Sequence, residues 1–570
     1  MNKRKKQPKS QVTPKAEIEF KPILLLVVII WVVAVYSSSI HGVFILDDRT
    51  LTEDKALTNL WSTDWFRITQ RPFTTFTFAI NFSLFGVEPL SCHLVNIAIH
   101  LVATASLYYL CKRSADILFP DTKEDLRVFF GLATALLWSL HPLCTSSVTY
   151  IVQRGESMAS MFMLLCLVCW TRAFGSDDSS PSPGRKWIWA LAAISAAYLA
   201  YGSKQMAAGL PIIVLLFDRF VLLKSWKSVA SRIGWYVLLL VPLVIGATLI
   251  LPGLLTAKAN ATAGFELKGM TPWSYFTTQP LVLLQYLKLT LLPYPQSLDY
   301  GWIPFKDSTY QVLGVLGWVV LFVGCCLVWR KSRAAAVSII AAFLVLAPTS
   351  TVMPLQDIIF EHRMYLPLAL LLAPLLAVFS GLANRATDIP QWKIVTVVAV
   401  ACGFSWISVN RNLDYDSEEQ LIQHDLTYNP DNPRLYRAFA GTLPDDQVDQ
   451  KIENLKKAIQ LSEARNYFYA GTDYKWRREL ADLYFFTNQI EPSIPLYEKA
   501  GELAYTPLQS TEIDFQMAMI ASIQGRNEDA EELFQRALQG HKQIRDQIEK
   551  VYNAHRQRIN ASSKIETPSK

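Results

Sequence analysis

Long apolar runs recur up to about residue 410 of this 570-residue sequence. Most are about 17–20 residues long and almost uncharged, so as helices they match a bilayer core of about 30 Å. Only 18% of the residues are charged, whereas a soluble globular chain carries about 25%. The pattern excludes a soluble cytosolic protein and a secreted disulfide scaffold. It predicts an all-α protein: a polytopic bundle of membrane helices followed by a soluble tail.

We predict eleven membrane spans from these runs. They cover residues 22–40, 91–111, 127–146, 156–174, 187–203, 206–223, 233–251, 310–329, 335–353, 365–383 and 393–409. A further apolar segment, Gln279–Leu292, has only about 14 residues, which is too short to cross a bilayer as a helix. We interpret it as an interfacial or re-entrant helix.

The basic residues predict the orientation of the spans. Residues 1–21 form a basic tail that begins MNKRKKQPKS, and the positive-inside rule places such a tail in the cytoplasm. Alternate loops, such as those with Lys112-Arg113 and Arg330-Lys331, are basic as well. An odd number of spans then places residues 410–570 on the opposite, extracytoplasmic side.

Residues 410–570 are polar and acidic, which predicts a separate soluble domain. Small and aromatic residues recur in it with an offset of 37 positions: Leu480, Ala481, Tyr484, Ser493, Tyr497 and Ala500, then Met517, Ala518, Ala521, Ala530, Phe534 and Ala537. This spacing is typical of tetratricopeptide repeats, which are stacked helix pairs that bind proteins or peptides. The alternative is a set of helical hairpins without a partner.

Two adjacent carboxylates, Asp47 and Asp48, follow the first predicted span. Because adjacent carboxylates repel each other, a metal ion, the neighbouring Arg49 or the positive end of a short helix should hold them ionised. The alternative is an ordinary hydrated loop, since Asp-Asp pairs are common in turns.

Further polar clusters lie on the same side of the membrane, four at predicted turns and one on a predicted helix. They are Arg71-Pro72; His93, Asn96 and His100; His141-Pro142 with Arg154-Gly155-Glu156; Ser203-Lys204-Gln205; and Glu361-His362-Arg363. His93, Asn96 and His100 share one helical face, which points either to a ligand or to hydrogen bonds with neighbouring helices. The combined charges suit a lipid-linked phosphate, because arginine and lysine bind phosphate while a carboxylate can act as a base.

In order along residues 22–409, these motifs resemble the transmembrane and tetratricopeptide-repeat-containing protein O-mannosyltransferases of the GT-C glycosyltransferase superfamily, with their bacterial relatives. Asn81 and the segment Gln279–Tyr300 also match. Two features depart from the family. The tail holds only two or three repeats, which favours a bacterial-type member, and Cys144-Thr145-Ser146-Ser147 replaces the more usual residues after His141-Pro142.

The resemblance implies a membrane enzyme that transfers a sugar, such as the hexose mannose, from a polyprenyl-phosphate donor to Ser or Thr hydroxyls of extracytoplasmic proteins, with inversion. Asp47 or Asp48 would be the catalytic base, and the other would orient it or bind Mg²⁺ or Mn²⁺, which this chemistry permits but does not require. The residues expected to bind the lipid phosphate or the sugar are Arg71, His93, Arg154, Glu156, Lys204, Glu361, His362 and Arg363. A bacterial-type member would lie in the inner membrane, with a periplasmic tail that recruits the protein acceptor and takes no part in the chemistry. No nucleic-acid partner is expected.

Three alternatives stay open at this point. A GT-C enzyme with another acceptor, either an oligosaccharyltransferase or a glycolipid-modifying transferase, would carry the same clusters. A lipid or glycan transporter would place its charges near the bilayer midplane, often with symmetric halves, whereas these charges gather at one surface. A membrane-anchored assembly scaffold would need no ordered set of cations and carboxylates.

Overall fold

The computed structural model describes residues 20–53, 57, 71–175, 183–255, 263–265, 267, 269–385, 388–465, 472–540, 545 and 548–554. Every regular element in these ranges is an α-helix or a 3₁₀-helix, and the same ranges contain no strand beyond one isolated bridge between Ala263 and Leu355. The predicted all-α class is therefore confirmed. Residues 1–19 of the predicted basic tail lie outside the described residues.

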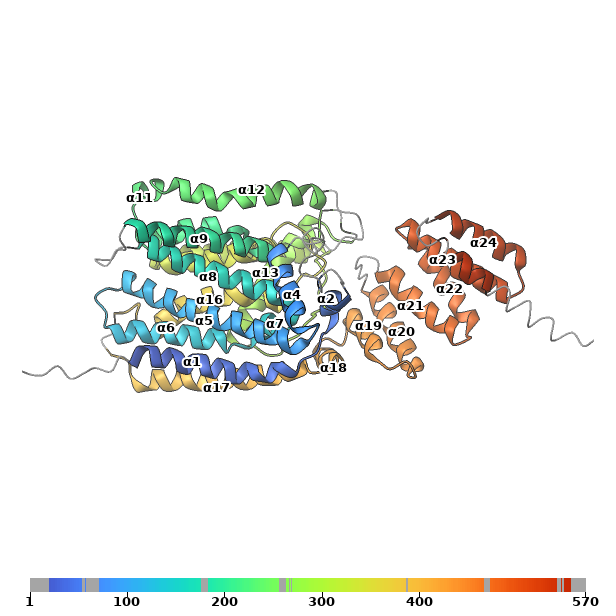
Figure 1. Cartoon of the computed structure of the whole chain (residues 1–570), viewed down its shortest axis with the longest axis horizontal. Helices are drawn as coiled ribbons and strands as arrows, with labels where there is room; N and C mark the ends of the chain where they lie inside the picture. The colour runs from blue at the N-terminus through green and yellow to red at the C-terminus, as the bar shows by residue number, and fades with distance from the viewer. Residues whose placement is uncertain are drawn as a thin grey trace, which may run out of the picture.

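The helices form two parts that lie end to end, a bundle of long, near-parallel helices and a group of shorter helices beyond one end of it (Figure 1). The main bundle helices are α1 (Phe20–Tyr36), α5 (Pro89–Leu118), α6 (Glu124–Ser139), α8 (Arg154–Phe174), α9 (Pro183–Ser203), α10 (Leu210–Phe220), α12 (Ile233–Leu255), α13 (Pro272–Leu291), α14 (Ser308–Lys331), α15 (Arg333–Leu346), α16 (Tyr365–Ser380) and α17 (Gln391–Asp414). Each of the eleven predicted spans overlaps one of these helices. By length and composition, six helices of the described part are long and apolar enough to cross a membrane, or seven if α6 and the segment Pro142–Val148 form one bent span. The number of spans stays a prediction.

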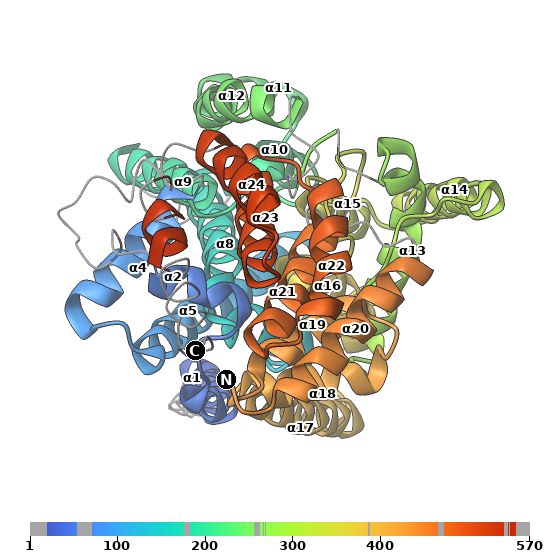
Figure 2. The ribbon, with the colours of Figure 1, turned by 90° about the vertical axis from the view of Figure 1, so that its right-hand side faces the viewer.

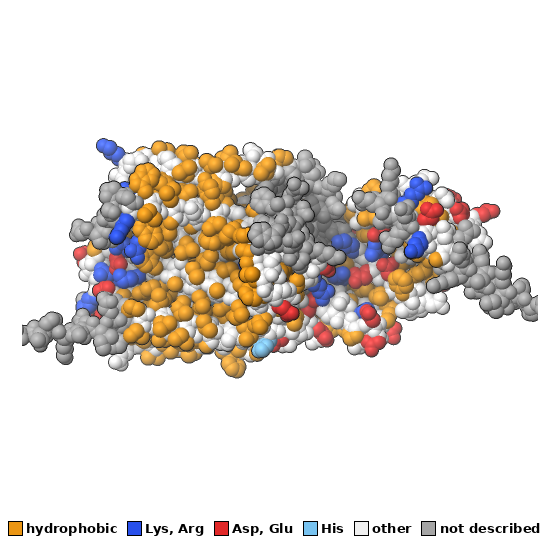
Figure 3. Space-filling view, viewed as in Figure 1, with side chains coloured by type: hydrophobic (Ala, Val, Ile, Leu, Met, Phe, Trp, Pro, Cys, Tyr) orange, Lys and Arg blue, Asp and Glu red, His pale blue; other side chains and the backbone are white. Residues whose placement is uncertain are grey.

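The outer surface of the bundle is apolar across its middle, with Lys and Arg side chains towards its ends (Figure 3). Helix α14 is the clearest case, because Val320 and Phe322 are 68% and 70% exposed. Water would make such exposure unfavourable, whereas lipid chains match these side chains. The belt and the apolar helices agree with the prediction of a multi-pass membrane protein.

Helix α13 is longer than the apolar segment Gln279–Leu292 predicted. The helix begins at Pro272. Polar residues such as Thr277 and Thr278 lower the hydropathy of its first half, but their hydroxyls donate to carbonyls of the same helix and are therefore compatible with it. Its first turn contacts the 347–360 loop, where the Tyr275 hydroxyl donates to the Thr349 carbonyl, and its last turn leads into the 292–307 loop. Both loops contact the C-terminal helices, so α13 begins and ends on the same side of the bundle.

The first and last bundle helices, α1 and α17, lie side by side in both ribbon views (Figures 1 and 2). The Trp31 indole N–H donates to the Ser405 hydroxyl at 3.0 Å, and beyond the helix ends the Val43 N–H donates to the Tyr415 carbonyl at 3.1 Å. This packing places the loop that follows α1 next to the start of the C-terminal part.

The C-terminal part consists of α18 (Glu418–Tyr428), α19 (Pro433–Thr442), α20 (Val448–Ala464), α21 (Thr472–Phe486), α22 (Ile490–Glu502), α23 (Pro507–Ile523) and α24 (Asn527–Gly540), and its helices cover the end of the bundle (Figure 2). The small residues that the repeat pattern singled out, Ala481, Ala500, Ala518 and Ala537, are fully buried. Their burial agrees with close helix packing at the predicted positions. The tetratricopeptide assignment and the boundary at residue 410 stay predictions; α17 runs four residues past that boundary, to Asp414.

Candidate active site

The loop after α1 carries the two adjacent aspartates on a short 3₁₀ turn, η2 (Leu46–Asp48), followed by α2 (Arg49–Glu53). Leu46 has a φ of 42°, a left-handed conformation that is unfavourable for a residue with a branched side chain. Buried packing of the preceding Ile45 against Tyr150 and Leu421 holds the turn in place. The strained turn fixes the directions of both carboxylates.

The carboxylate of Asp48 is fully buried and already engaged. It accepts hydrogen bonds from the backbone N–H groups of Ile45, at 3.2 Å, and Val152, at 2.6 Å. Burial raises the pKa of Asp48 to about 8 in spite of these two bonds. Asp48 therefore ties the loop after α1 to the turn before α8.

The carboxylate of Asp47, in contrast, is open to solvent, and no hydrogen-bond donor is assigned to it among the described residues. Its backbone N–H donates to the Tyr150 hydroxyl at 3.2 Å. Although the residue is exposed, the surrounding protein partly desolvates its carboxylate, and we call this position of Asp47 the recess. Burial raises the pKa of Asp47, as does the nearby Asp357, while Arg434 and Arg71 lower it. Of the two predicted bases, Asp47 is the one available to a substrate.

An ion pair lies beside this recess, at the start of α8. Lys204 Nζ is 2.7 Å from Glu156 Oε2 and donates to Gln153 Oε1 at 2.8 Å. Burial lowers the pKa of Lys204 to about 8, although Glu156 opposes the shift. The next residue, Gln205, accepts a hydrogen bond from Arg71 Nε at 3.3 Å, so Arg71 and Lys204 belong to one cationic cluster.

Arg154 lies deeper, fully buried behind the recess. Its Nε donates to Asn96 Oδ1 at 2.7 Å and its Nη2 to Asn81 Oδ1 at 3.0 Å, while its guanidinium stacks on the Phe78 ring at 4.0 Å. Nη2 also donates to the Cys92 carbonyl at 3.2 Å, whereas Nη1 is buried without a hydrogen-bond partner among the described residues. Arg154 thus joins α4 (Pro72–Phe85), α5 and α8 behind the site.

The polar face of α5 makes contacts within the protein. His93 Nε2 donates to the Gly42 carbonyl at 3.2 Å. Glycine permits this close approach, because a β-carbon at position 42 would lie only 2.9 Å from the same nitrogen. Asn96 holds Arg154, and His100 bonds to the Ser139 carbonyl and the Tyr365 hydroxyl. His93 therefore contacts the loop of the aspartates, while Asn96 and His100 make helix–helix hydrogen bonds.

The 3₁₀ turn η7 (Glu361–Met364) brings the last predicted cluster to the site. Glu361 is buried, and its oxygens accept from the Ser297 N–H at 2.8 Å, the Tyr300 hydroxyl at 2.7 Å and Gln296 Nε2 at 3.0 Å. Its carboxylate therefore serves to hold the 292–307 loop.

The other two charged or titratable residues of η7 face the cationic cluster. Arg363 donates to the backbone carbonyls of Ile358, at 3.1 Å, and Asp357, at 2.7 Å. The His362 ring stacks on Phe360, and its Nδ1 is buried without a partner among the residues the structure describes. Burial lowers the pKa of His362 well below its ordinary value, and the charges of Lys204, Arg363 and Arg71 lower it further, so these three predicted cations all lie within electrostatic range of the ring.

An apolar cavity of about 560 Å³ lies between α13, α14, α15 and α16. Its lining includes Tyr286, Trp318, Phe322, Phe343 and Met364. Tyr286 donates to the Phe360 carbonyl at 2.9 Å and Met364 directly follows Arg363, so one part of the cavity reaches η7. A chain bound there would lead to the cationic cluster.

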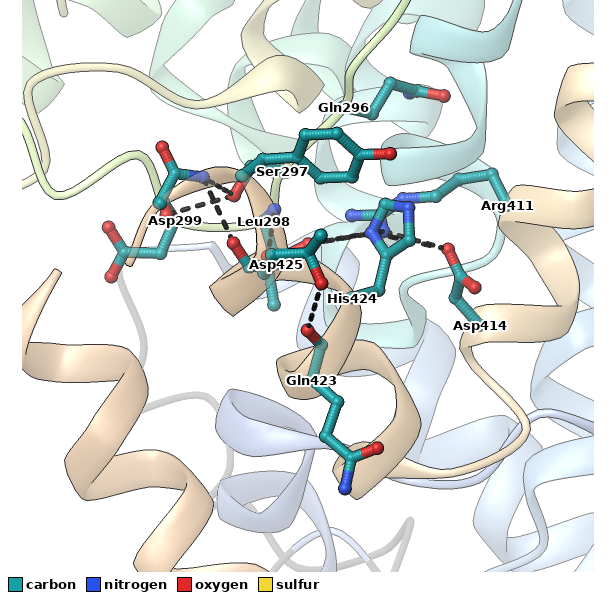
Figure 4. Close-up of polar contacts among 12 residues, drawn as sticks. Gln296, Ser297, Leu298, Asp299, Arg411, Asp414, Gln423, His424 and Asp425 are labelled. Carbon is teal, nitrogen blue, oxygen red and sulfur yellow. Dashed lines mark hydrogen bonds and ion pairs between the residues drawn. The ribbon is translucent and has the colours of Figure 1, made fainter. Parts of the chain in front are cut away.

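Residues of the C-terminal helices hold the site loops, and the sequence patterns did not single them out. Asp425 accepts from the Leu298 N–H at 2.6 Å and lies 3.3 Å from Arg411 Nη1, which also pairs with Asp414 (Figure 4). On α19, Arg434 pairs with Asp299 and Asp357. Arg434 follows Pro433, the first residue of α19, and the sequence offers no other signal for it.

Mg²⁺ or Mn²⁺ would have to bind at Asp47 and Asp48, the predicted ligands. Both oxygens of Asp48 already accept backbone hydrogen bonds, and within the described ranges no group of three or more His, Cys, Asp or Glu side chains could hold a metal ion. These side chains do not form a divalent-cation site by themselves, because such cations require several oxygen ligands.

No protein-family model matches the sequence. Among curated proteins, the chain is 22% identical to human protein O-mannosyl-transferase TMTC3 in an alignment of 591 positions that covers 92% of this chain and 61% of the relative. Mouse TMTC3 is also 22% identical, over 92% of this chain and 60% of its own. Human TMTC1 matches a shorter stretch, 20% of this chain and 12% of its own, at 34% identity. The chain thus spans about three fifths of the length of the TMTC3 proteins.

One solved structure, the archaeal oligosaccharyltransferase AglB from Archaeoglobus fulgidus in complex with an inhibitory peptide and a dolichol-phosphate, aligns with 76% of this chain and 59% of its own. Its identity is 12% and its TM-score 0.34, which is too low to support an argument about the site. The TMTC3 matches extend over the bundle and the C-terminal helices alike. They confirm the resemblance of this chain to the transmembrane and tetratricopeptide-repeat-containing protein O-mannosyltransferases.

Proposed function

We propose that this protein is a membrane glycosyltransferase that moves a hexose such as mannose from a polyprenyl phosphate to Ser or Thr hydroxyls of proteins outside the cytoplasm. The observation that carries the proposal is one available carboxylate, Asp47, beside a cluster of Arg71, Lys204 and Arg363. The similarity to proteins named protein O-mannosyl-transferases supports the type of reaction.

In the proposed reaction, Asp47 takes the proton of the acceptor hydroxyl while the hydroxyl oxygen attacks the anomeric carbon. The bond between that carbon and the phosphate oxygen breaks, and its electron pair leaves with the lipid phosphate. Arg71, Lys204 and Arg363 balance the charge of the leaving phosphate, so no acid is needed. Attack opposite the leaving group inverts the anomeric configuration.

The apolar cavity supports a lipid-linked donor. A polyprenyl chain in the cavity between α13 and α16 would place its phosphate near η7, where Arg363 and His362 lie. The remaining predicted residues, Asp48, His93, Arg154 and Glu361, then act by holding loops and helices in position, since their polar atoms mainly contact protein groups.

Purified protein in lipid nanodiscs tests the function directly. With undecaprenyl-phosphate mannose and a Ser/Thr-rich peptide, we expect the intact mass of the peptide to increase by one hexose. Transfer to a glycolipid or an asparagine peptide, with none to the Ser/Thr peptide, would favour the other GT-C acceptors and contradict the proposal.

Lys204→Ala is expected to slow transfer by about 10²-fold, because the leaving phosphate loses one balancing cation and Glu156 becomes an unpaired buried charge. Lys112→Ala is the matched control, since Lys112 makes a similar ion pair with Asp116, on a helix turn remote from Asp47. Initial rates over a range of donor concentrations measure the effect. A Lys204→Ala rate equal to that of Lys112→Ala would show that the cluster is structural.

We also infer that the protein lies in a bacterial inner membrane with its C-terminal helices in the periplasm. Helix α1 begins at the end of the bundle that is opposite the C-terminal helices (Figure 1). This arrangement supports a start of α1 and a C-terminal part on opposite sides of the membrane. Alkaline phosphatase fused after Lys570 should be active, because that enzyme requires an oxidising compartment. An inactive fusion in a stably expressed protein would contradict this orientation.

A further inference from the structure

One arginine of the C-terminal helices bridges two loops of the site. Arg434, near the start of α19, has its Nε 3.0 Å from Asp299 Oδ2 and its Nη1 2.7 Å from Asp357 Oδ1. Asp299 belongs to the 292–307 loop and Asp357 to the 347–360 loop. The two acidic side chains are 16% and 26% exposed, so the arginine neutralises carboxylates that are largely shielded from water.

The start of α19 is locked onto the same loop by a second set of contacts. Asn432 caps the helix by accepting from the Arg434 N–H at 3.0 Å, and its Nδ2 donates to the Asp299 carbonyl at 3.0 Å. Gly301, with a φ of 59°, lies against this cap, and a β-carbon there would be 2.5 Å from Asn432 Cγ. The position of Arg434 is therefore determined by the loop that it holds.

Both loops lead directly to η7. The backbone carbonyl of Asp357 accepts a hydrogen bond from Arg363 Nη2 at 2.7 Å. Ser297 and Gln296, close to Asp299 in the other loop, bind the Glu361 carboxylate (Figure 4 labels both). One guanidinium thus connects the segments that support each end of the Glu361–Arg363 turn.

The bridge also lies within electrostatic range of the recess. Asp357 raises the pKa of Asp47 and Arg434 lowers it, while Asp357 also raises the pKa of Asp299. Without the guanidinium, Asp299 and Asp357 would repel each other and the two loops would move apart.

We propose that Arg434 is a positioning residue for sugar transfer, through which the C-terminal helices hold the two loops that set the place of Arg363. The inference rests on the proposed function above. It differs from the expectation that the tail takes no part in the chemistry, because a side chain of the tail determines the geometry of the membrane-domain site.

Arg434→Gln, Arg434→Lys and Arg437→Gln in the full-length protein test this role. Arg437 is the matched control: it lies on the same helix and pairs with Glu479 of α21, away from the site loops. We expect Arg434→Gln to lower kcat by tenfold or more, about the effect of a misplaced group, with a smaller change in donor KM. Arg434→Lys should recover part of kcat, because an ammonium keeps the charge but cannot bridge both carboxylates in the same way. Arg437→Gln should match the wild type.

Hydrogen exchange of the 292–307 and 347–360 backbone amides provides a readout that does not depend on activity. Exchange should accelerate in Arg434→Gln and stay unchanged in Arg437→Gln. If Arg434→Gln does not fold, Asp357→Asn removes one of the two ion pairs, leaves the Arg434–Asp299 pair in place and keeps the carbonyl that holds Arg363. Because no two carboxylates then repel each other, we expect a smaller loss of kcat than for Arg434→Gln, and a wild-type kcat in this variant would overturn the proposal. Wild-type kcat in the Arg434→Gln protein, or an equal loss in Arg437→Gln, would overturn the proposal. A wild-type protein that transfers no mannose would instead refute the proposed function, and the exchange data would still report on the bridge.

Discussion

Asp47→Asn is expected to reduce sugar transfer by about 10³-fold while the protein stays folded, because the amide keeps the shape of the side chain and cannot take a proton. The Asp47 carboxylate is open to solvent and has no assigned donor within the described ranges, so its loss should not disturb the loop. The measurement is the transfer rate of undecaprenyl-phosphate mannose to peptide, together with thermal unfolding of the same sample.

Asp48→Asn should behave differently. Asp48 accepts from two backbone N–H groups, and an asparagine would turn a donor towards one of them. We therefore expect a lower unfolding temperature together with partial loss of activity. Glu53→Gln, an exposed change at the end of α2, is the control for both variants. Full activity of Asp47→Asn would rule out its role as the base, and a larger specific loss in Asp48→Asn would exchange the two assignments.

Ending the chain after Tyr415 is expected to abolish transfer to every acceptor, including a short peptide. This deletion removes Asp425, Asn429 and Arg434, which hold the 292–307 and 347–360 loops. It also removes Asp425 from Arg411, which keeps only Asp414 as a carboxylate partner. Size-exclusion chromatography and donor turnover would show a destabilised, inactive membrane domain.

Ending the chain after Arg465 is the matched deletion, because it keeps α18, α19 and α20 with all of these contacts. We expect this protein to transfer sugar to a peptide supplied in excess, and to lose transfer to whole-protein acceptors that the remaining helices would recruit. If both truncations retain equal peptide transfer, the first C-terminal helices do not support the site. If the longer one is also inactive, α21–α24 are needed for folding of the whole chain.

The helices of the membrane bundle could be predicted from sequence because their signal is local. A run of apolar residues long enough for a bilayer is already complete within each helix, as in Ser308–Lys331. The start of α13 was missed for the opposite reason, since its hydroxyl groups are satisfied only once the helix has formed. The candidate site residues were proposed from a similarly local signal, because charge next to an apolar helix is costly and therefore conspicuous. Their roles in the reaction stay predictions.

Residue patterns alone are enough to infer the apolar helices, the charged residues near one end of them and the polar helical part that follows. Only the tertiary structure distinguished Asp47 from Asp48, because the N–H of Val152, 104 positions away in the chain, occupies the second carboxylate. It likewise assigned Arg154 and Glu361 to internal hydrogen bonds and brought Arg434 to the site loops. Whether a charged side chain is free for a substrate depends on which groups already bind it. In this protein those groups come from distant parts of the chain, so local sequence does not reveal them.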